Sequence, residues 1–80
     1  MDLDRFLAWL VYCGCEEIED NRLYFLYQNK ENQQTAPIPN EAKIFKQNMY
    51  LICLSLKIDM PVEFGKYQRQ LDKIYKNADL

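Results

Sequence analysis

The chain of 80 residues has no histidine, a single serine and only two glycines. Histidine is the commonest general base and metal ligand in proteins, so its absence removes the simplest catalytic and metal-binding sites. Ser55 lies in a hydrophobic stretch, where a serine hydroxyl tends to bond back to its own helix. Glycine occurs only at positions 14 and 65, which leaves no glycine-rich loop to hold a phosphate. We therefore predict a protein that is not an enzyme and binds no small-molecule cofactor.

Cysteine and the acidic residues do not indicate a metal site either. The three cysteines are Cys13, Cys15 and Cys53; their odd number and the tight Cys-x-Cys spacing indicate reduced thiols. That spacing also differs from the cysteine pairs of zinc knuckles, and no second pair follows. The acidic residues between 16 and 20 lack the glycine and the regular spacing of a calcium loop. We interpret them as a solvated edge and predict no metal.

The chain also lacks long apolar runs and overall positive charge. Its most apolar segment, residues 49–56, is well below the roughly 18 residues of a membrane helix. The acidic start at Asp2 and Asp4 is unlike a secretory signal, so we expect a cytoplasmic protein without membrane contact. The net charge is -2: residues 1–41 hold eight acids and three bases (-5), and residues 42–80 hold seven bases and four acids (+3). A general nucleic-acid binder would be basic throughout.

The spacing of the apolar residues and the positions of the capping residues predict a single small α+β domain that begins with a helix. Asp2 is suited to cap this helix, and Gly14 is suited to end it in a left-handed conformation. The residues expected to face the core repeat at helical spacing: Leu3, Phe6, Leu7, Leu10 and Val11. Trp9 and Tyr12 fall outside this stripe.

Three short extended segments are predicted to follow. Residues 15–18 are expected to form an edge strand, and residues 23–27 have the strand preference of large and aromatic side chains. Residues 35–39 contain two prolines, which disfavour helix and indicate a third strand. In the second strand alternation separates the two faces, with Leu23, Phe25 and Tyr27 on one and Tyr24 and Leu26 on the other. Both faces are then apolar, so the sheet needs a second cover.

Two further helices are predicted after the sheet. Asn40 is expected to cap a helix over residues 41–56, whose core-facing residues would be Phe45, Met49, Ile52 and Leu56, flanked by Ile44 and Cys53. Pro61, with Asp59 before it, begins an amphipathic helix, whose apolar side would be Tyr67, Leu71, Ile74 and Ala78. The predicted architecture is an α-β-β-β-α core over residues 1–58 with an added C-terminal helix over residues 59–80. The first two helices should cover one sheet face, and the third should close an edge or end of the sheet.

Two sets of side chains are candidates for binding. Trp9, Tyr12 and Tyr24 would anchor a protein partner as exposed aromatics, although packing against the third helix explains Trp9 and Tyr12 equally well. The basic face of the C-terminal helix would meet phosphates or an acidic protein surface, or else simply face solvent: Lys66, Arg69, Lys73 and Lys76.

The predicted order resembles a known family, the HicA (YcfA-type) toxins of bacterial toxin–antitoxin pairs. The matching features are Gly14-Cys15, the aromatic strand at Tyr24-Phe25 and the extended Ala36-Pro37-Ile38-Pro39. The spacing of Ile44, Met49, Ile52 and Ile58 is similar to that family's closing helix. The resemblance covers roughly residues 3–58. It implies a double-stranded-RNA-binding-like fold and an origin in an mRNA-cleaving toxin.

The residues that carry cleavage in that family have no counterpart in this sequence. Asp20-Asn21-Arg22 stand where the family has Gly-Ser-His, and Gln47-Asn48 stand where its second helix has Gly-Thr. The resemblance therefore implies a non-catalytic relative. We predict a binding module that acts through protein contacts, by self-association or with a regulatory or adaptor partner. The alternative is an RNA- or DNA-binding domain that uses the basic helix face.

Overall fold

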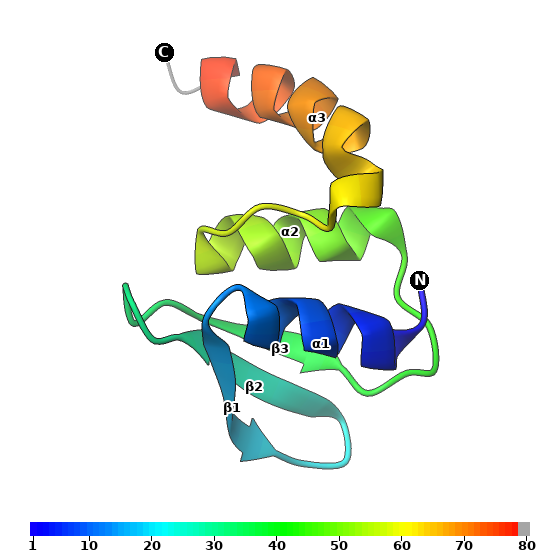
Figure 1. Ribbon diagram of the computed structural model, residues 1–80, viewed down its shortest axis with the longest axis vertical. Helices are drawn as coiled ribbons and strands as arrows, with labels where there is room; N and C mark the ends of the chain where they lie inside the picture. The colour runs from blue at the N-terminus through cyan, green and yellow to red at the C-terminus, as the bar shows by residue number, and fades with distance from the viewer. Residues whose placement is uncertain (79–80) are drawn as a thin grey trace.

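Two helices cover one face of a three-stranded sheet, and a third helix lies on the far side of the second (Figure 1). The computed structural model describes residues 1–78, with side chains as far as residue 75. The elements in chain order are α1 (Leu3–Tyr12), β1 (Cys15–Asp20), β2 (Tyr24–Asn29), β3 (Thr35–Pro39), α2 (Lys46–Leu56), a short 3-10 helix η1 (Val62–Phe64) and α3 (Gly65–Ala78). The sheet is antiparallel with strand order β1-β2-β3. The prediction of a small α+β domain is confirmed.

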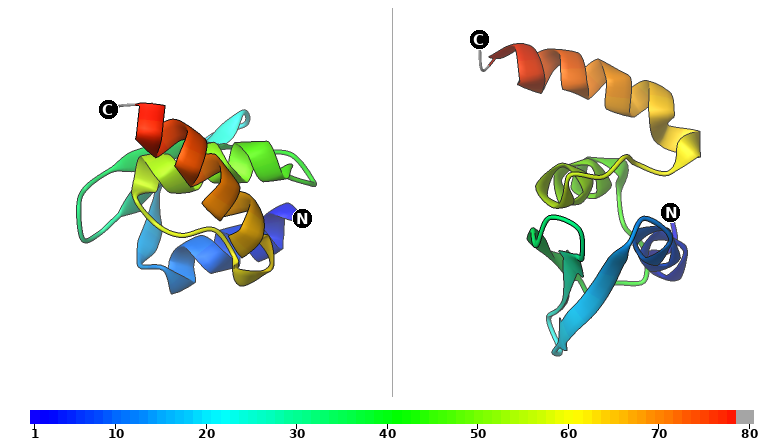
Figure 2. Two further views of the ribbon diagram at one scale, coloured as in Figure 1. Left: turned by 90° about the horizontal axis from the view of Figure 1, so that it is seen from above. Right: turned by 60° about the vertical axis from the view of Figure 1, so that its left-hand side comes forward.

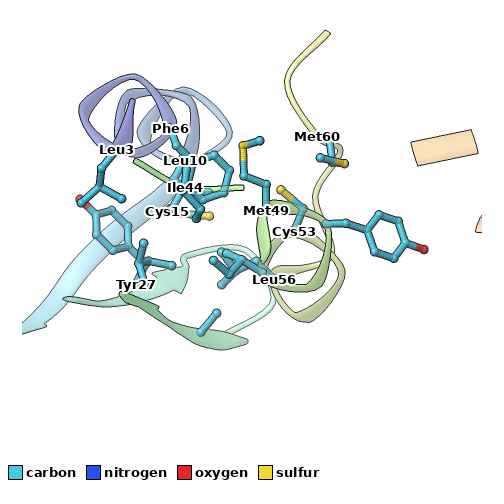
Figure 3. Close-up of a cluster of buried hydrophobic side chains, with 14 residues drawn as sticks. Leu3, Phe6, Leu10, Cys15, Tyr27, Ile44, Met49, Cys53, Leu56 and Met60 are labelled. Atoms are coloured by element: carbon cyan, nitrogen blue, oxygen red, sulfur yellow. The ribbon is translucent and has the colours of Figure 1, made fainter. Parts of the chain in front are cut away.

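The hydrophobic core lies between the inner face of the sheet and the helices α1 and α2 (Figure 3). Phe6 and Leu10 of α1, Ile38 of β3, and Met49 and Leu56 of α2 are all 0% exposed. Full burial of side chains of this size contributes roughly 1.5–3 kcal/mol each. This cluster is therefore the main source of stability. No helix in the described part of the chain is long and apolar enough to cross a membrane.

The loop between β2 and β3 holds the C-terminal end of α2. Asn29 is buried, and its Nδ2 donates to the carbonyl oxygen of Leu56 at 2.9 Å, while its Oδ1 accepts the backbone N–H of Glu31 at 2.9 Å. Asn32 Nδ2 donates to the same carbonyl at 3.2 Å. The last carbonyls of a helix have no intrahelical donor. The two asparagines supply that donor and join the loop to the helix.

Helix α1 buries a narrower stripe than its spacing predicts. Leu3, Phe6 and Leu10 are buried and Leu7 is half-buried, but Val11 is 60% exposed. The prediction that Val11 faces the core is wrong. Val11 is rotated by about 100° from Leu10 around the helix axis, and the contact of α1 with the core does not extend that far. Gly14 follows the C-cap residue of α1 with a φ of 90°. This left-handed conformation favours glycine and confirms its predicted place at the end of the helix.

Helix α2 begins at Lys46, five residues later than predicted. The backbone of residues 42–44 pairs with residues 1–3 at the N-terminus and is therefore not available to a helix. Asn40 is not the cap; the cap position is Phe45. Because Phe45 stands outside the helix, it does not follow the helical period, and it is 70% exposed rather than in the core.

The sheet also differs from the prediction at its ends. Strand β1 runs to Asp20 rather than to residue 18, and β2 begins at Tyr24. Leu23 is consequently in the turn before β2 and 80% exposed, so its predicted place in the sheet is wrong. Phe25 and Tyr27 do share the inner face and pack with the core, as alternation predicts.

The prediction that the third helix closes an edge or end of the sheet is wrong. Helix α3 lies over α2, away from the sheet (Figure 2), and aromatic contacts of Tyr50 with both Tyr67 and Tyr75 join the two helices. The outer sheet face, with Tyr24 and Leu26 half-buried, lies away from the described helices. The buried tyrosine of α2, rather than the sheet, determines where α3 lies.

Asn29→Ala is expected to lower the free energy of unfolding by about 1–3 kcal/mol, because it removes a donor to a buried carbonyl and a turn hydrogen bond at once. Urea unfolding followed by circular dichroism measures this change. Gln34→Ala, at an exposed position of the same loop, is the control and should change stability by less than about 0.5 kcal/mol. Equal stability of the two variants would contradict the capping role of Asn29.

Candidate functional site

Helix α3 is fastened through the linker that joins α2 to η1. Gln68 Oε1 accepts the backbone N–H of Met60 at 2.9 Å, and its Nε2 donates to the carboxylate of Asp59 at 3.0 Å. From the other side, the indole N–H of Trp9 donates to the backbone carbonyl of Asp59 at 2.8 Å. The linker is therefore held between α1 and α3.

Tyr50 is the central contact between α2 and α3. Its side chain is 2% exposed, and its hydroxyl donates to the Asp72 carboxylate at 2.8 Å. Its ring stacks with that of Tyr75, with 5.9 Å between centroids, and meets Tyr67 edge-on at 6.4 Å. The Lys46 ammonium lies 4.8 Å from the centroid of the Tyr67 ring, which is a cation–π contact. These contacts bury a tyrosine on the side of α2 that faces away from the sheet.

Exposed apolar side chains gather beside this contact. We name this set the helix strip; its members and their exposed fractions are Leu51 (52%) and Leu54 (41%) of α2, and Ile74 (62%) and Tyr75 (50%) of α3. Leu54 follows Tyr50 by one helical turn, and Tyr75 stacks on the Tyr50 ring. Tyr67 and Leu71, earlier in α3, are half-buried against the core. Helix α3 thus covers the first half of its apolar side and leaves the second half open.

A cavity of about 670 Å³ lies between α3, the linker and the end of α2. Its walls include Trp9, Cys53, Leu54, Lys57, Asp59 and Asp72. The volume is in the range of small-molecule sites, but both carboxylates are engaged in structural bonds, Asp72 with Tyr50 and Asp59 with Gln68. Within the described residues the cavity pairs no nucleophile with a base.

The cysteine thiols are held in their protonated form at neutral pH. Burial raises the pKa of Cys13 and of Cys15 above the ordinary value, and raises the pKa of Cys53 to about 12. A thiol is a much weaker nucleophile and ligand than a thiolate. All three cysteines are free. Among residues 1–78, no group of three or more cysteines and carboxylates is arranged to hold a metal ion.

The aromatic residues predicted to bind protein lie in two places. Trp9 and Tyr12 are brought together, with stacked rings 5.4 Å apart. Trp9 is half-buried and bonded to the linker, whereas Tyr12 is 81% exposed. Tyr24 is apart from them in β2, half-buried, and its hydroxyl donates to Glu19 at 3.2 Å. Packing accounts for Trp9, and the binding role of all three stays a prediction.

The predicted basic face lies along the exposed side of α3. Lys66, Arg69 and Lys73 are all exposed, and they form no salt bridge with any other described residue. The side chain of Lys76 lies outside the described residues. The three lysine and arginine side chains are therefore free to meet an anion, and their role in binding stays a prediction.

Neither edge of the sheet is suited to pair with a further strand. The bonds from Asn29 N–H to Gln34 and from Asn40 N–H to Leu23 show that even-numbered residues of β3 pair with β2. Residues 35, 37 and 39 then face the open edge, and Pro37 and Pro39 have no N–H to donate. The other edge, β1, has a bulge between positions 17 and 19 and four exposed acids. Bulges and charges discourage edge pairing.

The helix strip was not predicted, although the sequence carried a signal for it. Residues 49–54 of α2 are all apolar or aromatic, and a helix that is apolar on every side must be covered on more than one side. The residues predicted to face the core from this helix do not include Leu51 or Leu54. The exposure of Leu51 and Ile74 depends on where α3 lies, and no local pattern indicates that position.

Comparison of the chain with protein-family models, with curated proteins and with solved structures gives no match. The resemblance to the HicA toxins therefore stays a prediction. Function is inferred from the side chains described above.

Raising the pH from 10 to 12 is expected to weaken the attachment of α3 in the wild-type protein more than in Tyr50→Phe. Burial, with the hydrogen bond to Asp72, raises the pKa of Tyr50 from 10.0 to about 12. A group whose pKa is raised by folding stabilises the native state fully below its unfolded pKa and loses this contribution as the pH approaches the folded value. Urea unfolding at a series of pH values measures the difference.

The wild-type curve should therefore fall more steeply than the Tyr50→Phe curve between pH 10 and 12. The two proteins differ only in the hydroxyl of residue 50, so the difference between the curves isolates Tyr50. Parallel curves would show that folding does not raise the pKa of Tyr50, and they would contradict this prediction.

Proposed function

We propose that the protein is a small non-catalytic binding module that acts through protein contacts at the helix strip. The observation that carries this proposal is the exposure, between 41% and 62%, of four large apolar side chains on two adjacent helices. Soluble monomers expose apolar residues singly, and a contiguous patch of them marks an interaction surface. Tyr12 and Tyr24 are secondary candidates, because each stands apart from this patch.

The balance of energies favours a protein partner over a polyanion. Burying a large apolar side chain contributes roughly 1.5–3 kcal/mol when it is complete, so four half-covered side chains offer several kcal/mol together. An exposed ion pair contributes about 0–1 kcal/mol, and salt screens it beyond roughly 8 Å at physiological ionic strength. The strip therefore has more binding energy to offer than Lys66, Arg69 and Lys73.

We further propose a double-stranded-RNA-binding-like fold and a relationship to the HicA toxins without their nuclease residues. The order of α1, three antiparallel strands and α2, with both helices on one sheet face, supports the proposal. At the position of the family's histidine motif, Asn21 Oδ1 accepts the N–H groups of Leu23 and Tyr24 at 2.8 and 3.0 Å. This asparagine stabilises a turn, and it has no capacity to act as a general base.

The second candidate function is binding of RNA or DNA by the basic side of α3. One observation favours it: Lys66, Arg69 and Lys73 are exposed together on one helix. Arginine and lysine that neutralise phosphates release counterions, so such binding weakens steeply with salt. It would also be independent of the helix strip.

Changing the strip to polar residues is expected to abolish complex formation while leaving the fold intact. Leu51→Ser with Ile74→Ser should remove the protein that the wild type retains from native lysate, and any concentration-dependent self-association seen by light scattering. Val62→Ser, which changes an apolar residue that is 86% exposed elsewhere, is the matched control. Retention of the same partner by the strip variant would refute the proposal.

Retention on duplex RNA is expected to be negligible at about 150 mM salt and weak at low salt. The alternative function predicts the reverse: retention that survives at physiological salt, with the logarithm of affinity falling by about 0.9 per contacted phosphate for each decade of salt. Lys66→Glu with Lys73→Glu would then abolish retention, and Leu51→Ser with Ile74→Ser would not. That result would replace the protein-binding function with the nucleic-acid one.

A further inference from the structure

Basic side chains lie along one flank of the helix strip, whereas Asp59 and Asp72 line the cavity beside Leu54. Helix α2 contains no acidic residue, and Lys46 at its start lies against the Tyr67 ring. In α3, Lys66 and Lys73 are exposed about a quarter turn from Ile74. Asp72, the acidic residue of this helix, accepts the Tyr50 hydroxyl within the contact between the helices. The strip therefore has an apolar floor and a basic flank.

We propose that the helix strip binds an amphipathic helix with acidic flanks that belongs to a different protein. This inference rests on the proposed protein-binding function and names the partner's chemistry. A strip that runs along two helices matches the mode in which a helix lays its apolar side into a groove. The open second half of α3, roughly seven of its 14 residues, corresponds to about 10 Å of helix, which accommodates about two turns of a partner.

A second copy of the chain fits this strip less well. In a two-fold dimer the strip would face itself and place the lysine-bearing flanks of both copies in one interface. Like charges placed across an interface disfavour the complex. The chain's own acidic run in β1 lies at the opposite end of the long axis from α3 (Figure 1), and it is a bulged strand rather than a helix.

The two parts of the strip have different roles in this interaction. The apolar side chains of the strip supply affinity, because partner binding removes them from water. The basic flank supplies selection and orientation, since complementary charge mainly speeds association and rejects partners of the wrong sign. The proposal therefore predicts a preference between two peptides that differ only in the sign of their flanking charges.

The test uses synthetic amphipathic helices of about 18 residues, long enough to be partly helical in water. One peptide has leucines at helical spacing flanked by glutamates, and the second replaces those glutamates with lysines. Fluorescence anisotropy should give about tenfold tighter binding of the acidic peptide, a difference of about 1.4 kcal/mol. Lys66→Glu with Lys73→Glu should reverse the preference. Lys30→Glu with Lys43→Glu, at exposed positions away from α3, should leave it unchanged.

Leu51→Ser with Ile74→Ser should weaken binding of both peptides at least about tenfold, with circular dichroism confirming that the fold is kept. Equal binding of the two peptides would overturn the acidic-helix inference, and the protein-binding function would stand if native partner capture still depended on the strip. Peptide binding that is equally tight in the wild type and in Leu51→Ser with Ile74→Ser would overturn the inference as well. So would comparable binding of a duplex RNA that depends on the lysines but not on Leu51 and Ile74.

Discussion

Helix α2 buries side chains in two directions, and each layer of the molecule depends on it. On one side Met49 and Leu56 close the core against the sheet and α1. On the other side Tyr50 holds α3 through its hydroxyl and its ring. The β2–β3 loop joins the same helix, because Asn29 supplies the donor that the Leu56 carbonyl lacks. A helix that is apolar on every side requires cover on every side, and α3 provides only part of it.

Local patterns in the sequence were sufficient to predict most elements, because their causes are local. Alternation in β2, the prolines of β3 and Gly14 after α1 each act within a few residues. The errors arose where distant segments compete for the same backbone. Residues 42–44 pair with the N-terminus instead of extending α2, which leaves Phe45 outside the helix. The position of α3 is set by the contact between Tyr50 and Asp72, which are 22 residues apart. A hydropathy pattern gives no sign of a polar contact between residues so far apart in the sequence.

The same limit applies to the candidate site. Helical spacing identified Trp9 and Tyr12 as lying outside the core stripe, whereas the helix strip depends on where α3 lies.

The carboxylates at the cavity are held in structural hydrogen bonds, and neither edge of the sheet is suited to strand addition. Burial keeps the cysteine thiols protonated, and the carboxylates at the cavity are used to fasten α3. Pro37 and Pro39 remove donors from one sheet edge, and the bulge with its exposed acids disrupts the other. The surface that we propose for a partner is the exposed apolar side of α2 and α3, with lysines beside it.

The proposed binding of a partner at the helix strip would be energetically linked to the attachment of α3. A free helix of about 14 residues is marginal in water, because propagation barely offsets the cost of nucleation. Here Gln68 and Asp72 provide three hydrogen bonds, each contributing about 1 kcal/mol, and Tyr67 and Leu71 are only half-buried. Ile74 contributes little while it faces water, and Tyr75, which is half exposed, contributes mainly through its stacking on Tyr50. A partner that covers them adds burial to the least supported half of the helix, so it stabilises the surface to which it binds. Part of its binding energy is then spent on holding α3 in place, and variants that fasten α3 more firmly would bind the same partner more tightly.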